Sequence, residues 1–368
     1  MRDANPLVKC LVWDLDNTLW QGTLLEDGQV HLPKAVRDVV VELDARGILQ
    51  SVASRNDHEH AWEQMQKLGI GDYFVLPQIG WGPKSESLRA IAQELNFASA
   101  AMAFIDDQPA ERAEVAHLLP QVRCYEAAAA LTLPTLPEFS PATVTTDARR
   151  RREMYKAGFR RNAERSQFTG PDEAFLRTLG LAMRVERAGN EEISRIEELT
   201  LRTSQMNATG VHYSDQALRA LAADDRHEVL VVMLSDRFGP HGAVGVILLE
   251  KGVTAWRLKL LATSCRVVSY GVGTVLLHWL ADEAARSGAH LLADFHRTER
   301  NRMMEIAYRF VGFDDRSCTC REELPPTDGA QLLHLEPTRQ SPPAHLNVIV
   351  PVLHKPGAAS VAWAPPGG

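Results

Sequence analysis

The chain has 368 residues, of which 45% are hydrophobic and 24% are charged, and its formal net charge is −7. This length predicts two domains of ordinary size, and the composition is typical of a globular protein. The acidic balance excludes the basic surface that nucleic-acid binding requires, so we expect no nucleic-acid partner.

The N-terminus and the cysteine content indicate where in the cell the protein is expected. Acidic and polar residues precede any long apolar run, and no run approaches the length of a membrane span. We therefore expect no signal peptide, no membrane partner and a cytoplasmic location. The five cysteines are too scattered for a disulfide framework. Cys318 and Cys320 form a C-x-C pair, but no second pair or nearby histidine completes a metal site in the sequence, so we expect them to be structural.

Residues 1–140 alternate between strand and helix patterns. Apolar segments predict strands at residues 8–13, 48–57, 73–77 and 101–109, and helical spacing predicts helices at residues 34–46, 58–68 and 83–96. Strands that alternate with helices predict a doubly wound parallel sheet.

Polar residues recur where the predicted strands end. Asp14 and Asp16 follow the first strand, Ser54 ends the second, and Asp106 and Asp107 end a later one. Asp, Asn and Ser are also common in turns, which would explain any one of these positions. Turns alone would not place polar residues at successive strand ends, whereas open α/β sheets bind ligands there.

The pattern Asp14-x-Asp16-x-Thr18 after an apolar strand resembles the first motif of the haloacid dehalogenase (HAD) superfamily. The remaining pieces follow in order: Ser54, Lys84 and the Asp106-Asp107 pair. This resemblance implies a phosphatase. The short spacings from Thr18 to Ser54 and from Ser54 to Lys84 leave no room for a large cap domain, so we expect an open site.

The chemistry explains these residue types. A carboxylate, Asp14, can attack phosphorus, and Asp16 can protonate the leaving oxygen and later activate water. Mg2+ prefers hard oxygen ligands, and the expected ones are Asp14, the Asp16 backbone carbonyl, Asp106 and Asp107. The expected phosphoryl contacts are Thr18, Ser54 and Lys84, and the lysine also offsets the crowded negative charge.

The rest of the chain predicts a second domain. Residues 127–143 are rich in Ala, Pro and Thr and look like a linker, and we expect a helical linker over residues 141–178. The arginine run at 149–153 is expected to be a solvated helix face. Strand-like segments and a helix at 273–287 predict a second α/β domain over residues 179–336, and the Pro- and Gly-rich residues 337–368 predict a flexible tail.

A loop in this second domain carries a second candidate site. After a strand that ends near residue 262, the sequence gives Ser264, Cys265 and Arg266, and Gly271 and Gly273 then precede an apolar helix. A glycine-bearing turn before a helix can hold an anion. The loop resembles the one that binds the coenzyme A pyrophosphate in GNAT acyltransferases. Arg266 would lower the pKa of a neighbouring thiol, although a lone cysteine is more often a small buried hydrophobe.

Residues from about 8 to 335 resemble the FkbH-like family, which joins a HAD phosphatase domain to a GNAT-like domain. The segments that carry the resemblance are VWDLDNTLWQG, FIDDQPAER, ELTLRTSQMNATG, DRFGPHGAVG, TSCRV and HRTERN. The resemblance implies transfer of a glyceryl unit from 1,3-bisphosphoglycerate to the phosphopantetheine arm of an acyl carrier protein in polyketide biosynthesis. It also implies that Cys265 carries the unit as a thioester.

The same segments supply further candidates. Gln205, Asn207, Thr298 and Asn301 are candidate substrate contacts, and Asp236 and Arg237 are further candidates, although polar residues in such segments brace a fold as often as they touch substrate. His296 is a candidate general base, because histidine is the residue type whose ordinary pKa lies near neutrality. The chain departs from the family loop, because Ser269, Tyr270 and Gly273 stand where Gly, Arg and Glu are usual. These departures leave the acyl group and the carrier surface open.

Two other interpretations remain open at the level of sequence. One is an Mg2+-dependent phosphatase whose second domain binds a carrier without catalysis. The other is a non-catalytic scaffold that recruits a carrier protein. The Asp14 and Asp16 pair argues against the scaffold, which has no need for two crowded acids.

Overall fold

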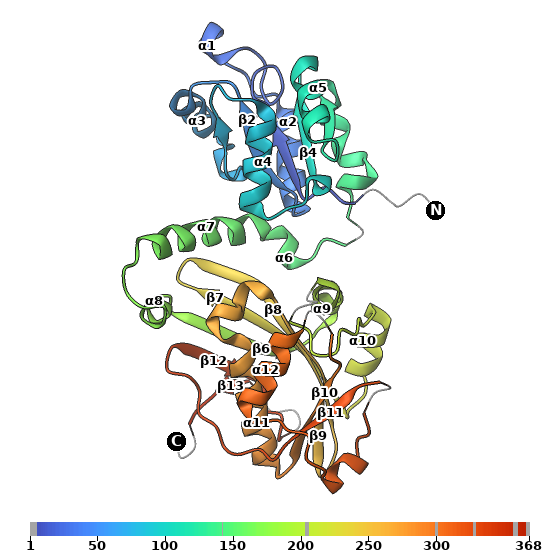
Figure 1. Cartoon of the computed structure of the whole chain (residues 1–368). Helices are drawn as coiled ribbons and strands as arrows, with labels where there is room; N and C mark the ends of the chain where they lie inside the picture. The colour runs from blue at the N-terminus through green and yellow to red at the C-terminus, as the bar shows by residue number, and fades with distance from the viewer. Residues whose placement is uncertain are drawn as a thin grey trace. The chain divides into compact units, whose positions relative to one another are not determined.

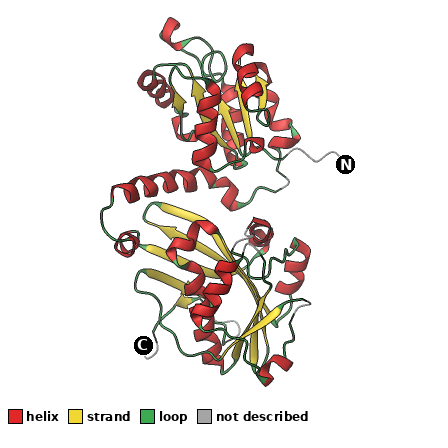
Figure 2. Cartoon of the chain, in the orientation of Figure 1, coloured by secondary structure: helices red, strands yellow, loops and turns green. Residues whose placement is uncertain are grey.

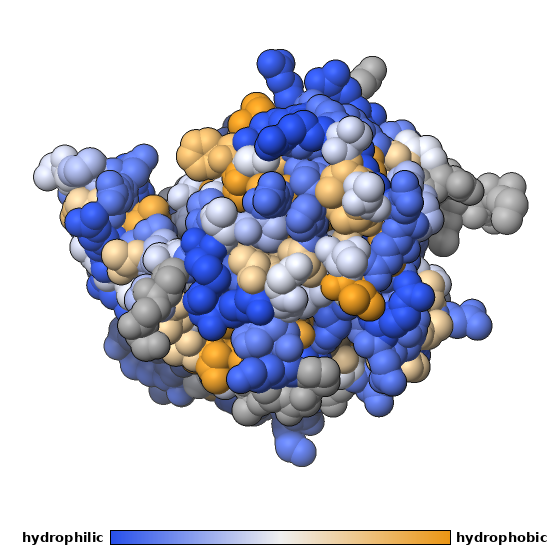
Figure 3. Space-filling model, turned by 90° about the horizontal axis from the view of Figure 1, so that it is seen from below, coloured by the Kyte–Doolittle hydropathy of each residue, from blue (hydrophilic) through white to orange (hydrophobic). Residues whose placement is uncertain are grey.

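The computed structural model describes residues 6–141, 143–202, 206–298, 301–326, 329–355 and 360–365 (Figure 1). It divides into two units, residues 1–156 and 157–368, which we call the first and second domains. No helix within these described ranges is both long and apolar enough to cross a membrane. The face drawn in Figure 3 is mostly hydrophilic, with small and separate hydrophobic patches.

The first domain is built on a parallel sheet. Its described strands have the spatial order β3-β2-β1-β4-β5, and every neighbouring pair is parallel. The elements are β1 (Cys10–Trp13), α1 (Leu24–Asp27), α2 (Lys34–Ala45), β2 (Leu49–Ser54), α3 (His58–Lys67), β3 (Gln78–Ile79), α4 (Lys84–Leu95), β4 (Met102–Asp106), α5 (Pro109–Leu118) and β5 (Arg123–Glu126).

This strand order makes the sheet doubly wound. The chain moves outward from β1 to β3 and then returns to place β4 on the other side of β1. Right-handed crossovers then put α2 and α3 on one face and α4 and α5 on the other, where α4 and α5 contact each other (Figure 2). Only short elements lie between Thr18 and Lys84. The predicted doubly wound sheet without a large cap is confirmed.

The central strands are apolar because helices cover both faces of the sheet. All four residues of β1 are buried, and so are all five of β4. A strand with one solvent-facing side would alternate between apolar and polar residues. The buried centre therefore forces the chain's polar groups to the strand ends, where the sheet stops.

Two expectations for the end of the first domain are wrong. The supposed linker includes the 3-10 helices η3 (Ala127–Thr135) and η4 (Pro137–Phe139), and Leu133 and Phe139 are fully buried in the first domain's core. The arginine run is not merely solvated, because Arg152 Nε donates to Asp44 Oδ1 at 2.8 Å and Arg151 donates to the Gly47 carbonyl at 2.7 Å. Residues 127–139 fold onto the first domain because their apolar side chains are buried there, although their composition is typical of a linker.

The second domain is built on a mixed sheet. Its described strands have the order β11-β10-β9-β8-β7-β6-β12-β13. The elements from the chain's middle onward are α6 (Thr146–Arg149), α7 (Arg151–Gln167), α8 (Asp172–Thr178), β6 (Leu181–Arg187), α9 (Asn190–Arg202), α10 (Asp215–Ala222), β7 (His227–Asp236), β8 (Gly239–Lys251), β9 (Ala255–Thr263), η5 (Cys265–Tyr270), α11 (Val272–Ser287), β10 (His290–Phe295), α12 (Arg302–Val311), η6 (Thr319–Glu322), β11 (Gln331–Leu335), β12 (Leu346–Val350) and β13 (Val361–Ala362). The predicted second α/β domain is confirmed.

The end of the chain differs from the expected flexible tail. Residues 346–350 form β12, which pairs in parallel with β6 inside the sheet. The Glu283 carboxylate accepts the Leu353 backbone N–H at 2.7 Å, and the Trp363 indole donates to Asp282 at 3.2 Å. The apolar residues of β12 bury against the domain core, which the surrounding Pro and Gly content concealed.

Candidate functional site

The first candidate site lies at the carboxyl ends of β1 and β4. These strands are neighbours, with Trp13 opposite Ile105, so the residues that follow them meet at one edge of the sheet. Carboxylate oxygens of Asp14, Asp106 and Asp107 lie within 4.8 Å of one another. The Asp107 backbone N–H donates to the Thr18 hydroxyl at 2.9 Å, which ties the loop after β1 to the end of β4.

Lys84 holds this group of acids together. The lysine is the first residue of α4 and is only 3% exposed. Its Nζ donates to Asp14 Oδ1 at 2.5 Å and to Asp106 Oδ2 at 2.7 Å, and it lies 2.7 Å from Glu111 Oε2. One buried cation thus contacts three carboxylates. We call Asp14, Lys84, Asp106, Asp107 and Glu111 the carboxylate site.

The electrostatics of this site follow from its burial. Burial raises the pKa of Asp14 to about 7, and the nearby Asp106 charge adds to the rise while Lys84 opposes it. The pKa of Asp106 is also raised, again by burial first. Burial alone would lower the pKa of Lys84, but the two aspartates raise it above its usual range. The lysine therefore stays charged, and the acids need further positive charge to ionise together.

The Asp16 side chain bonds to the start of α1, to the loop before it and to the residues after β2. Its Oδ1 accepts from the Trp20 indole at 2.8 Å and from the Leu24 backbone N–H at 3.0 Å, and its Oδ2 accepts from Asn56 at 3.0 Å. Three donors hold the side chain in this position.

Sequence reasoning missed several residues of this site. Glu111 contacts Lys84 and also lies 3.1 Å from Arg55, and Asn56 holds Asp16. Arg55 and Asn56 follow Ser54 directly, and the recurrence of polar residues at strand ends could have identified them. Ser54 itself is buried at the end of β2, and its contact with a phosphoryl group stays a prediction.

The donor set of the carboxylate site fits Mg2+. Asp14, Asp106 and Asp107 offer hard oxygen atoms within one small volume, and Asp107 is partly exposed. These three carboxylates would hold the ion, and the Asp16 backbone carbonyl stays a predicted fourth ligand. A bound Mg2+ would supply positive charge to a phosphoryl group and to the acids around it.

The second candidate site begins where two parallel strands of the second domain part. β9 and β10 pair from Ala255–His290 to Leu258–Ala293, and β9 then continues to Thr263 without that partner. The Ala208 N–H donates to the Leu261 carbonyl, and the His296 N–H donates to the Ala208 carbonyl, both at 3.1 Å. The segment at 206–208 therefore lies between the two diverging strands.

Four candidates from the sequence lie around this segment. Asn207 and Asn301 are buried, and their side chains bond to backbone groups: Asn207 Oδ1 accepts the Gly210 N–H at 2.8 Å, and the Asn301 amide donates to the Asn207 and Ala208 carbonyls at 3.2 and 3.3 Å. These contacts brace the loop. Thr298 and Asn301 bond each other, and the His296 side chain is exposed. Their contacts with substrate stay predictions.

The glycine loop leads into α11 as the sequence predicts. Ser264 follows β9, and Ser264 Oγ accepts from Arg266 Nε at 3.3 Å. Gly271 has φ +71°, a conformation that favours glycine, whereas a Cβ at Gly273 would meet open space. Cys265 begins η5, but its side chain lies outside the described residues, as does the whole of Gln205.

A pocket of about 230 Å³ opens beside this loop. Thr263, Gly271, Gly273 and Thr274 line one side of it, and residues of α12 line the other. We call the loop at 264–273 together with this pocket the loop site. Its lining is mainly apolar, with backbone groups of the loop at its edge.

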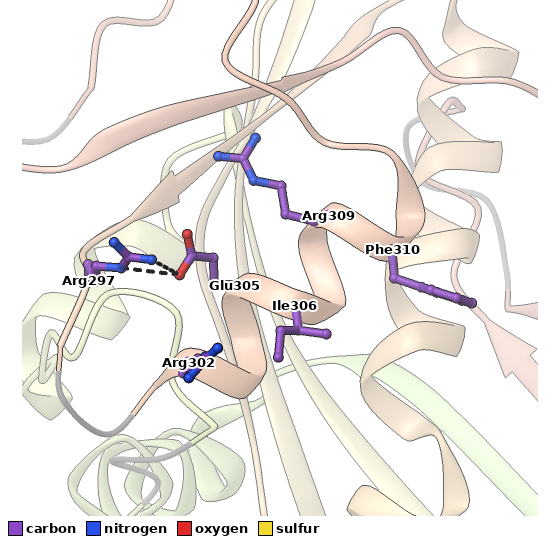
Figure 4. Close-up of a pocket in the computed structure, with 6 residues that line it drawn as sticks. All are labelled: Arg297, Arg302, Glu305, Ile306, Arg309 and Phe310. Carbon is purple, nitrogen blue, oxygen red and sulfur yellow. Dashed lines mark hydrogen bonds and ion pairs between the residues drawn. The ribbon is translucent and has the colours of Figure 1, made fainter.

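A larger pocket of about 510 Å³ also lies along α12 (Figure 4). Its lining residues are Arg297, Arg302, Glu305, Ile306, Arg309 and Phe310. Arg297 and Glu305 face each other, with an N–O distance of 2.8 Å, and Ile306 and Phe310 lie on the same side of the helix. Ile306 and Phe310 line both pockets, so one exposed helix face joins them.

Sequence reasoning also missed a histidine that borders the loop site. His241 is 9% exposed, its Nε2 lies 3.1 Å from Asp236 Oδ2, and its ring packs edge-on against Tyr270 at 5.4 Å. Burial lowers the pKa of His241, Asp236 opposes this fall, and the charges of Arg161 and Arg266 add to it. The ring is therefore neutral near pH 7 and oriented by a carboxylate, as general bases usually are.

Comparison with known proteins gives partial matches. No protein-family model matches the chain, and no curated protein matches it. Among solved structures, the N-terminal part of a Bacteroides fragilis protein, which contains a phosphatase domain and is complexed with Mg, is 30% identical over 37% of this chain and 42% of that chain, with a TM-score of 0.34. The match thus spans less than half of that solved chain.

Two further solved structures cover a similar share of this chain. Ard1 from Thermoplasma volcanium is 15% identical over 42% of this chain and 96% of that chain, with a TM-score of 0.31. The ribosomal-protein-S18-alanine N-acetyltransferase from Escherichia coli is 18% identical over 43% of this chain and 96% of that chain, with a TM-score of 0.32.

Proposed function

We propose that the chain is a bifunctional glyceryltransferase and phosphatase of the FkbH-like kind. It takes a glyceryl unit from 1,3-bisphosphoglycerate, removes both phosphates and loads the unit on the phosphopantetheine thiol of an acyl carrier protein. The observation that carries the proposal is the carboxylate site, where one buried lysine contacts Asp14, Asp106 and Glu111. A carrier-binding scaffold would have no use for such a charge network, which is costly to bury.

The carboxylate site supports hydrolysis of a phosphate ester. An Asp14 oxygen attacks phosphorus, the ester P–O bond breaks, and the departing alkoxide takes a proton from Asp16. Water then attacks the phosphorus of the aspartyl phosphate, Asp16 accepts its proton, and inorganic phosphate leaves. Lys84 lies beside Asp14, so it can also contact a phosphoryl oxygen. The absence of a large cap suits a substrate that is attached to a carrier.

The loop site supports the transfer half of the proposal. In this half the Cys265 thiolate attacks the acyl carbon of 1,3-bisphosphoglycerate, the bond to the phosphate oxygen breaks, and phosphate leaves. The carrier's pantetheine thiol, once deprotonated, attacks the resulting thioester and releases the Cys265 thiolate. The pocket beside Gly271 and Gly273 offers apolar walls to the pantetheine arm.

The buried pair of His241 and Asp236 favours His241 as the base for this transfer. The pair borders η5, which Cys265 begins, through the contact between His241 and Tyr270. His296, which the sequence favoured, stays a second candidate and has an exposed side chain.

The α12 surface suits an acidic carrier protein. Arg302 and Arg309 are exposed, and beside them the apolar side chains of Met303, Ile306 and Phe310 are 52%, 52% and 76% exposed. Charged groups around an apolar centre are typical of transient protein interfaces. Because the pocket of the loop site shares this helix, a carrier bound there could direct its arm into the loop site.

Mass spectrometry of the intact protein tests this proposal. After incubation with 1,3-bisphosphoglycerate, the wild-type protein should gain one glyceryl or phosphoglyceryl unit that hydroxylamine removes. Cys265→Ala should gain none and load no holo carrier, yet still hydrolyse a generic phosphate ester. Cys124→Ser is the matched control and should acylate normally. An adduct that persists in Cys265→Ala, or equal loading of apo and holo carrier, would contradict the mechanism. Hydrolysis without any adduct would favour the simple phosphatase.

A further inference from the structure

Two histidines and two cysteines of the second domain converge outside both sites described above. His290, Cys318, Cys320 and His334 each offer one ligand atom, and these atoms all lie within 4.8 Å of one another. No histidine lies near the C-x-C pair in the sequence, and the pair by itself predicts a structural role for the two cysteines. The expectation that no histidine completes a metal site with this pair is wrong. His290 lies 28 residues before Cys318 in the sequence, yet the two side chains are in contact in the folded protein.

Sheet register brings the histidines together. His334 of β11 lies opposite Leu292 of β10, and His290 precedes Leu292 by two residues, so His290 and His334 are diagonal neighbours on one face. Cys318 and Cys320 arrive from η6, which follows α12. Cys320 packs with Leu292 and Leu332 in a small apolar cluster. Two adjacent strands and one separate turn thus supply the four groups.

The separations between these atoms suit a tetrahedral metal centre. His290 Nδ1 lies 2.9 Å from His334 Nε2 and 3.5 Å from Cys318 Sγ. For Zn–N bonds of about 2.0 Å and Zn–S bonds of about 2.3 Å, tetrahedral angles place N and S about 3.5 Å apart. Each of the four side chains can therefore reach one central ion after small rotations.

The surroundings of His334 give an independent indication. Its Nδ1 is buried and has no hydrogen-bond partner within the described part of the chain, while Asp314 Oδ1 lies 3.8 Å away. Asp314 and His334 also exchange two backbone hydrogen bonds of 2.8 Å. Metal-bound histidines usually direct their second ring nitrogen at a carboxylate, which orients the ring. Asp314 is placed for that role.

A hydrogen bond between the His290 and His334 rings, without a metal ion, explains fewer of these observations than a metal site does. It would account for the 2.9 Å separation, but it gives no role to the two thiols and leaves the buried Nδ1 of His334 unmatched. Both cysteines are free thiols. Soft sulfur and imidazole ligands in a tetrahedral arrangement select zinc over Mg2+, which the carboxylate site would prefer.

We propose that His290, Cys318, Cys320 and His334 form a structural Zn2+ site that ties η6 to β10 and β11. Four protein ligands fill the coordination of zinc, so the ion stabilises the fold and leaves no position for substrate. This site is independent of the proposed transfer and phosphatase activities.

Metal analysis of the full-length protein tests the proposal. Protein purified without an affinity tag and in the presence of a reductant should contain about one zinc per chain, as a closed tetrahedral site requires. Cys318→Ser and His290→Asn should lose this zinc, whereas Cys124→Ser, which changes a half-buried thiol of the first domain, should keep it. Asp314→Asn should keep the site but lower its Zn2+ affinity about tenfold or more.

Cobalt substitution keeps the test decisive if these variants fold poorly. Wild-type protein stripped of metal and titrated with Co2+ should develop a thiolate-to-cobalt charge-transfer band and the strong visible bands of tetrahedral cobalt. The carboxylate site holds no thiolate, so Co2+ bound there cannot produce the first band. Folded wild-type protein that contains no zinc and gives no such band with Co2+ would overturn the proposal.

Discussion

The carboxylate site and the loop site differ in how completely the fold assembles them. In the first, the side chains of Asp14, Lys84 and Asp106 are at most 7% exposed and are already bonded to one another. In the second, Arg266 is exposed on the loop, and Ile306 and Phe310, which line the pocket, are 52% and 76% exposed. Buried contacts therefore assemble the carboxylate site, whereas the loop site has exposed side chains along its pocket.

This difference follows from the two sheets. In the first domain, adjacent parallel strands end together, so residues that follow them meet without further support. In the second domain, β9 and β10 diverge, and the segment at 206–208 lies between them. Divergence creates room for a long ligand, but it leaves the positions of catalytic groups to loops. Substitutions in the carboxylate site should therefore change both enzymatic activity and folding stability. Substitutions in the loop site should change activity and leave stability unaltered.

The largest expected effect comes from the Asp14→Asn variant. The amide keeps the shape but removes the nucleophile, so phosphate release from an ester should fall on the order of 10³-fold or more. Acylation of Cys265 should persist, because it occurs in the other domain. Phosphate release and the intact mass of the protein, measured on the same sample, check the loss of phosphatase activity and the retained acylation. Full phosphatase activity in this variant would rule out the assigned nucleophile.

The Lys84→Met variant tests whether the carboxylate site contributes to the stability of the first domain as well as to phosphatase activity. Removing the cation leaves Asp14, Asp106 and Glu111 facing one another, which costs about 3–5 kcal/mol of folding free energy for a buried network. Thermal unfolding should show this loss, and added Mg2+ should restore more stability than in the wild type. Lys34→Met alters an exposed lysine of the same domain and should change neither property. Equal stability of both variants would contradict the role given to Lys84.

The His241→Gln variant tests whether a change in the second domain affects activity without affecting stability. Loss of a general base should slow carrier loading about 10²-fold while leaving phosphatase activity and folding intact. His296→Gln should slow it by less than about tenfold. Because the folded protein lowers the pKa of His241, the base stays neutral below its usual titration range. Loading in the wild type should therefore decline at a lower pH than it would with a histidine of ordinary pKa. The opposite ranking of the two variants would favour His296.

The smallest expected effect comes from the Arg302→Glu variant on the exposed face of α12. Reversing this charge should raise the KM for an acidic holo carrier about tenfold without changing kcat, and added salt should reduce the difference. Arg177→Glu reverses an exposed charge on α8 and serves as the control. A small pantetheine thiol as acceptor should react equally with both variants. No change in KM for the carrier would place carrier docking elsewhere.

The sequence predicted the carboxylate site well because its signals are local. Asp14 and Asp106 directly follow strands that their apolar residues identify, and parallel strands in one sheet must end at a common edge. Glu111 escaped because a helical glutamate looks like any solvated one until α5 turns it toward Lys84. The pairing of His241 with Asp236 escaped because only the turn between β7 and β8 brings them together.

By itself, the sequence determined the alternation of strands and helices in residues 8–109, the two-domain class, the acids at the strand ends and the glycine loop before α11. These follow from hydrophobic periodicity and from backbone preferences, which act over a few residues. Only the tertiary structure decided that β12 joins the sheet, that Lys84 contacts three carboxylates and that Cys318 meets His290. Such contacts join residues far apart in the sequence. Their geometry is set by strand register and core packing, which local patterns do not encode.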